Sequence, residues 1–107
     1  MGRSISAVSE TRETVAVTST YTALSGQILL IDTSAATFTI TLPANPTIGA
    51  RINLIDAAGN CGTNKAVIAR NSSKIANLAE DLDFDIKNAS LELIYTGSAY
   101  GWSILSN

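Results

Sequence analysis

Histidine is absent from this chain, and cysteine and tryptophan each occur once. Without histidine, both a Ser-His-Asp triad and a histidine-ligated metal site are excluded. The single cysteine, Cys61, cannot form an intrachain disulfide or a multi-cysteine metal site, and it has no histidine to act as its base. With no histidine and a single cysteine, the commonest nucleophilic and metal sites cannot be built, so we expect no enzyme and no cofactor.

Charge is also scarce, at 15% of residues against about 25% in an average soluble domain. The seven basic residues are scattered and the net charge is −2, whereas nucleic-acid binding needs clustered basic charge. The longest uncharged apolar run, Ile28–Ile31, is too short to cross a bilayer. We therefore expect no nucleic-acid partner and no membrane insertion, and residues 1–20 contain no apolar block that would indicate a signal peptide.

What is abundant is the pattern of short strands and turns, most clearly at Phe38–Asn60. Apolar residues at 38, 40 and 42 alternate with threonines, the period of a strand with one buried face. Pro43 and Pro46 end that strand because they lack backbone donors. Gly49 allows a bend before a second strand at Arg51–Asp56, and an Asp/Gly/Asn turn follows. This unit predicts two strands and a turn, and none of its residues is suited to catalysis.

Similar patterns predict further strands at Glu13–Thr18, Gln27–Asp32, Lys65–Arg70, Lys74–Ala76, Leu82–Ile86, Leu91–Thr96 and Trp102–Leu105. Tyr21–Gly26 is interpreted as a connection, and a helix over 73–87 is the alternative to its two strands. Gln27–Asp32 is apolar on both faces, as expected for a central strand or for one covered by a neighbouring subunit. The prediction is an all-β domain: a small antiparallel β-sandwich or barrel of about eight short strands. Residues 1–20 would be an N-terminal arm with the first strand, and residues 21–107 the β-sandwich module.

Two groups of side chains are candidates for a site. Asp81, Asp83 and Asp85 superficially copy a calcium loop, but the position that needs glycine is Ile86. They fit better as the solvated face of a strand whose other face is apolar.

Tyr95, Tyr100 and Trp102 lie close together near the C-terminus. They are interpreted either as a sugar-stacking platform or as a terminal strand that closes the core with its largest side chain.

The order of short motifs along the chain resembles that of a known protein family. The motifs are Tyr21 with Leu24-Ser25-Gly26, Asp32-Thr33, Thr39–Pro43, Pro46–Gly49, Ile55–Asn60, Thr63-Asn64, Leu93–Gly97 and Gly101–Ile104. In this order they resemble the β-rich module of tail-fibre, neck and baseplate-associated structural proteins of tailed bacteriophages, especially cyanophage and myovirus-like virions. The resemblance covers Tyr21 to Ile104 and rests on the ordered set, because no single motif is specific.

The resemblance implies a non-enzymatic and often trimeric module in fibres or whiskers that project from the virion. Because this chain is a single module without a long shaft, we expect a small accessory, tip or decorating protein of the virion. It would form a homotrimer and dock on other virion proteins through Met1–Thr20. The alternatives are a carbohydrate-binding module that recognises a host surface glycan and a capsid decoration protein.

Overall fold

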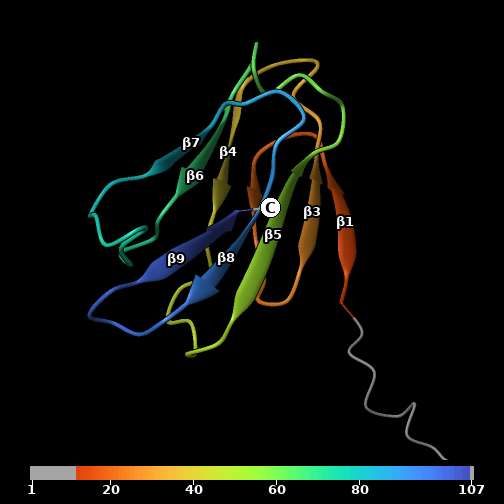
Figure 1. Cartoon of the computed structure of the whole chain (residues 1–107). Coiled ribbons are helices and arrows are strands. Elements are labelled where there is room, and N and C mark those ends of the chain that lie inside the picture. Colours follow the sequence, from red (N-terminus) through yellow and green to blue (C-terminus); the bar gives the residue numbers. More distant parts are fainter. Residues whose placement is uncertain (1–11, 107) are drawn as a thin grey trace, which may run out of the picture.

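The computed structural model describes residues 12–106, which form nine strands and no helix (Figure 1). The strands are β1 (Thr14–Val17), β2 (Tyr21–Thr22), β3 (Ile28–Ile31), β4 (Phe38–Thr41), β5 (Arg51–Asp56), β6 (Ala66–Ala69), β7 (Leu82–Phe84), β8 (Ser90–Tyr95) and β9 (Trp102–Ser106). The predicted all-β class is confirmed. Of the N-terminal arm and first strand predicted at residues 1–20, residues 1–11 lie outside the described residues, and the first strand is β1.

The strands belong to two mixed sheets, so the prediction of an antiparallel fold was wrong. One sheet has the order β1-β3-β5-β8-β9 and the other the order β2-β4-β6-β7. From β1 to β6 the chain alternates between the sheets, so that neighbours within a sheet are two strands apart in sequence and run in the same direction (Figure 1). Only the pairs β5–β8, β6–β7 and β8–β9 are antiparallel.

Most of the expected strands are present within one or two residues of their predicted bounds, because their period-two pattern matches one buried face. In β5, for example, Ile52, Leu54 and Asp56 are buried while the residues between them are partly exposed. The apolar strand predicted at Gln27–Asp32 is β3, and it is central, lying between β1 and β5. Tyr21 and Thr22, expected in a connection, instead form β2 by pairing with Ile40 and Thr41.

The two sheets share one core. Its buried apolar side chains come from both sheets and include Val17, Leu29, Ile31, Ile40, Ile52, Leu54, Ile68, Phe84, Leu93 and Trp102. Burying a side chain such as Leu or Ile contributes about 1.5–3 kcal/mol relative to leaving it exposed. This core, assembled from short strands far apart in sequence, is the main source of stability.

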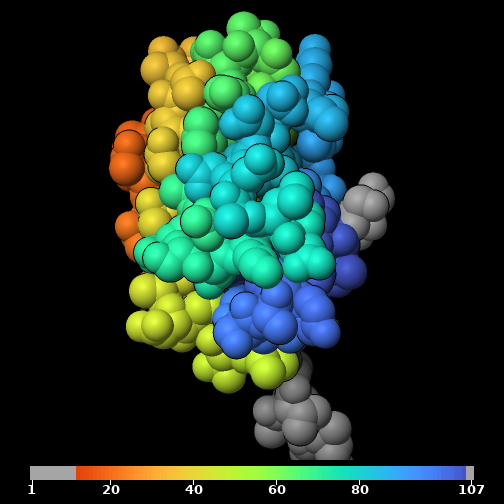
Figure 2. All heavy atoms as spheres, turned by 90° about the vertical axis from the view of Figure 1, so that its left-hand side faces the viewer, coloured from red at the N-terminus to blue at the C-terminus, as the bar shows by residue number. Residues whose placement is uncertain are grey.

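The segment 71–81 covers one side of the molecule, shown in green and cyan in Figure 2. The strand predicted at Lys74–Ala76 was wrong, because Ala76 and Asn77 have φ values of 52° and 65°, in the left-handed region that interrupts a strand. Ile75 makes only isolated bridges, to Leu78 and Trp102. The next strand, β7, ends at Phe84, so Ile86 is 67% exposed and does not belong to the apolar face expected for it.

Candidate functional site

The outer face of the five-stranded sheet is the most distinctive surface of the described molecule. The strand register places its side chains in rows that cross the sheet: Thr14, Ile28, Asn53, Glu92 and Leu105; then Ala16, Leu30, Ile55 and Ser90; then Arg51, Ile94 and Ser103. The nine strands of residues 12–106 are all used in the two sheets, so none of them is left to cover this face. Four large aliphatic side chains of its central strands are therefore only half-buried: Ile28, Leu30, Ile55 and Ile94.

The outer face of the four-stranded sheet has a different character. The register gives it the rows Thr22, Thr41 and Ala69, and Thr39, Val67 and Asp83. Its only ion pair among the described residues joins Lys65 Nζ and Asp83 Oδ2 at 3.2 Å. Threonines and this ion pair are suited to water, whereas the aliphatic rows on the other sheet are not. The two outer faces thus differ in composition, and the larger aliphatic side chains are on the five-stranded sheet.

A small polar group interrupts the aliphatic rows. Glu92 Oε2 lies 3.4 Å from Arg12 Nη1 and 3.9 Å from Arg51 Nη1, so one carboxylate serves two guanidinium groups. The Arg12 side chain also donates from Nε to the Gly26 carbonyl at 2.9 Å. Beside Glu92 in the same row, the Asn53 amide has a buried Oδ1 with no hydrogen-bond partner among the described residues. Buried acceptors of this kind are rare in folded proteins.

A second surface lies at the end of the molecule where the β2–β3, β4–β5 and β8–β9 loops meet. The amide of Gly26 donates to the Arg51 carbonyl at 2.7 Å, and the amide of Gly49 donates to the Tyr95 carbonyl at 2.8 Å, which connects the three loops. Figure 2 shows the β4–β5 loop (yellow) beside the β8–β9 loop (blue) at this end. One large side chain from each loop is exposed: Leu24 by 60%, Ile48 by 73% and Tyr100 by 60%.

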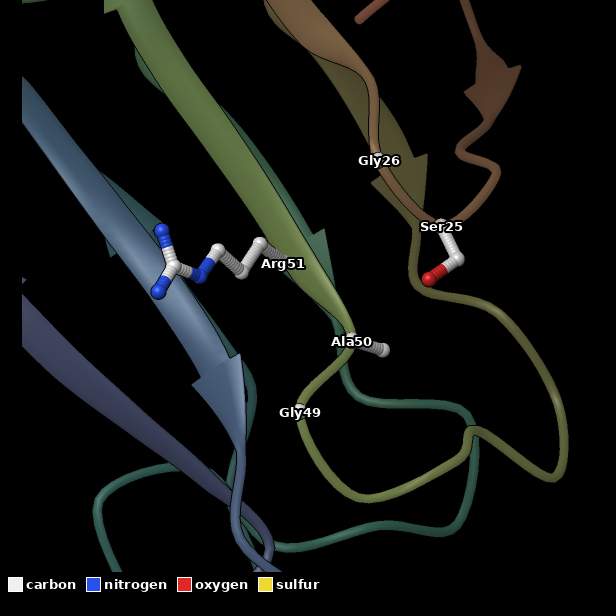
Figure 3. Close-up of a pocket in the computed structure, with 5 residues that line it drawn as sticks. All are labelled: Ser25, Gly26, Gly49, Ala50 and Arg51. Atoms are coloured by element: carbon white, nitrogen blue, oxygen red, sulfur yellow. The ribbon is translucent and has the colours of Figure 1, made fainter. Parts of the chain in front are cut away.

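An open pocket of about 350 Å³ lies at this loop end, lined by Ser25, Gly26, Gly49, Ala50 and Arg51. Both glycines have positive φ values, and a Cβ added to either would meet no atom within 4 Å, so the backbone there is open to solvent. Figure 3 shows the Ser25 hydroxyl on one side of β5 and the Arg51 side chain extending over β8 on the other. The Ser25 hydroxyl and the Arg51 guanidinium therefore do not converge on one point and do not form an acid–base pair.

The three aromatic residues predicted as a platform do not share one surface. Trp102 is fully buried and Tyr95 is nearly so, with their ring centroids 5.4 Å apart. Tyr100 alone is exposed, in the β8–β9 loop. Glycan binding by these rings stays a prediction, and Tyr100 is the member that a ligand in solution can reach.

The most extensively hydrogen-bonded carboxylate is Asp56, at the end of β5. Its Oδ1 accepts from the amides of Gly59 and Asn60, at 3.1 and 3.2 Å. Its Oδ2 accepts from the amides of Cys61 and Asn88, at 3.2 and 2.8 Å. Burial alone raises the pKa of Asp56, but hydrogen bonds from the Asn88, Cys61 and Asn60 amides and from the Cys61 side chain outweigh it and leave the pKa below its ordinary value. Asp56 thus connects the β5–β6 loop to the segment before β8.

Cys61 is fully buried beside this carboxylate. Burial, together with the nearby Asp56, raises the pKa of its thiol to about 11. A thiol in this environment stays protonated and is a poor nucleophile.

The acidic pattern at 81–85 does not form a metal centre. Asp81 accepts a hydrogen bond from the amide of Arg70 at 2.9 Å, Asp83 pairs with Lys65, and Asp85 is exposed. No group of three or more potential metal ligands occurs in residues 12–106. That part of the chain also has no helix long and apolar enough to cross a membrane.

The roles of Asn53, Glu92 and Asp56 were not identified from the sequence. The first two depend on the register of β5 against β8, which no local pattern encodes. Asp56 had a local signal, because an aspartate followed by Ala-Ala-Gly-Asn is typical of a turn held by a side-chain carboxylate. Neither a scan against models of protein families nor a search of the curated proteins finds a match to this chain.

Proposed function

We propose that this protein is a non-enzymatic structural module of a tailed-phage virion, a compact β-sandwich that assembles as a homotrimer. The trimer would belong to a tail fibre, neck or baseplate and contribute to host attachment. The ordered motifs between Tyr21 and Ile104 support the virion assignment. Assembly occurs through the outer face of the five-stranded sheet, and Met1–Thr20 provides the attachment to other virion proteins.

The proposed assembly rests on one observation. Aliphatic side chains on the outer face of the five-stranded sheet are half-buried, whereas the outer face of the four-stranded sheet has rows that contain threonines. Ile28, Leu30 and Ile55 are neighbours across β3 and β5, and their burial against another copy would add to stability at about 25 cal/mol per Å² of apolar surface. The low charge of the chain limits the desolvation cost of such a contact.

The two groups with perturbed pKa values near the β5–β6 loop fit a structural role. The carboxylate of Asp56 is occupied by four amide donors, and the thiol of Cys61 is buried and stays protonated. Both groups stabilise loop structure, and neither is poised to react with a substrate. They therefore support a structural role for the protein.

Light scattering behind size exclusion, repeated over a hundredfold dilution, tests the proposal. We expect a constant mass of three times the 11.2 kDa chain. Leu30→Lys should dissociate the assembly, because a charged ammonium would replace an aliphatic contact at its centre. The matched control is Val67→Lys, on the outer face of the four-stranded sheet, which should leave the mass unchanged. A wild-type monomer at every concentration would refute the proposal.

A second candidate, recognition of a host surface glycan, is favoured by the loop end, where the exposed Tyr100 ring and the pocket at Arg51 belong to connected loops. An aromatic face and a few polar groups are the usual elements of a sugar site. Glycan-array binding that is lost in Tyr100→Ala, with the folded spectrum retained, would support it. Binding that is unchanged in this variant would place the glycan elsewhere. A capsid decoration protein would use the same assembly face.

A further inference from the structure

We infer that the open edge of β9 binds the N-terminal residues 4–9 of a neighbouring copy as an added β-strand. This inference rests on the proposed homo-oligomer and names one of the contacts that would hold it together. β9 is the last strand of the five-stranded sheet, and β1 is the strand at the opposite edge (Figure 1). An unpaired edge strand is a template on which another chain can form further backbone hydrogen bonds.

Of the four edge strands in residues 12–106, β9 alone has none of the features that protect an edge. β2 has only two residues, and β7 has three, one of which is the charged Asp83. β1 follows directly after the charged Arg12 and Glu13. β9 has five residues without charge or proline, and its Ile104 and Leu105 are 36% and 44% exposed. Because natural sheets protect their edges by shortness, charge or proline, β9 is the edge suited to a partner strand.

The hydrogen bonds around β9 show which of its backbone groups are available. The Trp102 amide donates to the Lys74 carbonyl at 2.8 Å, and the Trp102 carbonyl accepts from the Ala76 amide at 2.7 Å, so these groups point away from β8. Strand alternation gives the backbone of Ile104 the same outward direction. Ala76 and Asn77 have left-handed φ values, so the segment 71–81 turns away after this single bridge. The amide and carbonyl of Ile104 thus have no backbone partner among the described residues.

Residues 4–9 have a composition that matches this edge. They read Ser-Ile-Ser-Ala-Val-Ser, without charge, proline or glycine, between Arg3 and Glu10. Ile5 and Val8 are β-branched, the type of side chain favoured in strands. An uncharged segment can pair with β9 without the cost of desolvating a charge, and its apolar side chains can cover the exposed aliphatic side chains of β9.

The length of the N-terminal segment places the partner in a neighbouring copy. Arg12 is held at the β1 edge of the sheet, where its Nε donates to the Gly26 carbonyl at 2.9 Å. From β1 to β9 the sheet spans four strand spacings of about 4.8 Å each, or roughly 19 Å. If residues 4–9 are paired, only residues 10 and 11 connect them to Arg12, and an extended link of that length covers about 10 Å. A chain therefore cannot place this segment on its own β9.

The same geometry sets the kind of assembly. A contact in which each copy gives its segment to the next is heterologous, and heterologous contacts close into rings. Such a ring of three copies is the homotrimer proposed above. Pairing of β9 with β9 of a second copy would instead give a two-fold dimer.

Crosslinking between residues 4–9 and β9 tests the pairing. Ser6→Cys/Ile104→Cys is treated with a flexible bis-maleimide, which tolerates a small shift in register, at a concentration where light scattering shows the assembly. Covalent dimers and trimers should appear on a denaturing gel. Each single variant is a control and should stay monomeric on that gel, since native Cys61 is fully buried.

Three results of the crosslinking would overturn the inference. An assembled double variant that gives no crosslink would exclude the strand contact. A link confined to single chains would mean that the segment reaches its own β9. A covalent dimer of the Ile104→Cys single variant would mean that β9 meets β9 of a second copy.

A proline variant tests the backbone contact without a crosslinker. Ile104→Pro removes the outward amide and leaves the ladder with β8 intact. It should raise the concentration at which the assembly half-dissociates by about tenfold, the effect of one lost hydrogen bond. The matched control is Ala16→Pro on β1, whose amide also points away from its sheet because the neighbouring Val17 carbonyl accepts from Asp32. This control should leave the assembly unchanged, and circular dichroism confirms that both variants are folded.

The light-scattering results separate the two proposals. If wild type assembles and Ile104→Pro dissociates no more easily than Ala16→Pro, the strand contact is wrong but the proposed oligomer stands. If wild type is a monomer at every concentration, both proposals fail.

Discussion

Tyr95 and Trp102 are opposite one another on β8 and β9, and their rings meet edge to face with an interplanar angle of 62°. Such aromatic pairs contribute about 0.5–1.5 kcal/mol beyond the area that they bury. The pair lies where the β8–β9 hairpin leaves its turn, and Ile75 bridges to Trp102 from the covering segment. Trp102 thus connects the end of the five-stranded sheet to the segment that closes the core.

Truncation of this ring should be among the most costly substitutions in the chain. Trp102→Ala should reduce the free energy of unfolding by about 3–5 kcal/mol, measured by urea denaturation, because it leaves a large cavity. Tyr100→Ala is the natural comparison, since that ring is exposed, and it should change stability by about 0.5 kcal/mol or less. A stable, fully folded Trp102→Ala protein would contradict the role of the indole in the core.

Gly101 lies so close to the Lys74 backbone that a substitution there tests this contact. Its φ is 78°, and an added Cβ would lie 2.1 Å from the Lys74 carbonyl oxygen, so the covering segment would have to move. Gly26 has a φ of 90° with no atom within 4 Å of an added Cβ.

Gly26→Ala should therefore cost only the conformational penalty of about 1–2 kcal/mol, whereas Gly101→Ala should cost several kcal/mol more or prevent folding. Thermal unfolding of the two variants under the same buffer measures the difference. Equal effects would mean that the contact with Lys74 is easily relieved.

Asp56 should make stability depend on pH in the acid range. Its folded pKa is below the ordinary value of 3.8, so its contribution is fully present above that value and is lost as the pH falls through the folded pKa. Wild type should thus lose stability below about pH 4, and Asp56→Asn should flatten that loss.

At neutral pH the Asp56→Asn variant should be less stable by about 1–3 kcal/mol, because one carboxylate oxygen that accepts two amides is replaced by a donor. Denaturation curves between pH 3 and 7 measure both effects. A wild type whose stability rises as the pH falls from 5 to 3 would show that other carboxyls dominate.

Cys61 should report on unfolding. With a pKa of about 11, its thiol is almost entirely protonated at pH 8, and it is also fully buried. A thiol-specific reagent at pH 8 should therefore react slowly with native protein and fast in urea, with the same midpoint as circular dichroism. Fast reaction of the folded protein would indicate local opening of the β5–β6 loop.

Local patterns in the sequence were enough to locate most of the strands. Alternation at Phe38–Thr41 and Arg51–Asp56 reflects one buried face, and the proline and glycine between them end and restart the strands. The sheet order was not accessible in this way. Two strands that are consecutive in sequence belong to different sheets here, and nothing local distinguishes that arrangement from a hairpin.

The candidate assembly face was inaccessible for a related reason. Ile28, Asn53 and Glu92 become a single row only through pairing between strands far apart in sequence. The apolar character of Gln27–Asp32 did indicate a central strand, yet it could not identify the strands on either side of it. The short β2 was missed because its two residues become a strand only by pairing with β4.

The alternation of the chain between two sheets has a kinetic consequence. Paired residues in the parallel ladders are far apart in sequence: Thr14 pairs with Ile28, Leu29 with Leu54 and Phe38 with Ala66, separations of 14, 25 and 28 residues. Loops of this length must close, at a cost in conformational entropy, before the paired strands can stabilise one another. Proteins dominated by such contacts fold in about milliseconds to seconds. The β8–β9 hairpin, in which Tyr95 and Trp102 are only seven residues apart, is the one ladder of the five-stranded sheet that can form early. The newly made chain would then spend much of its folding time with the apolar β3 unpaired. During this interval the exposed strand can pair with another chain, which leads to aggregation.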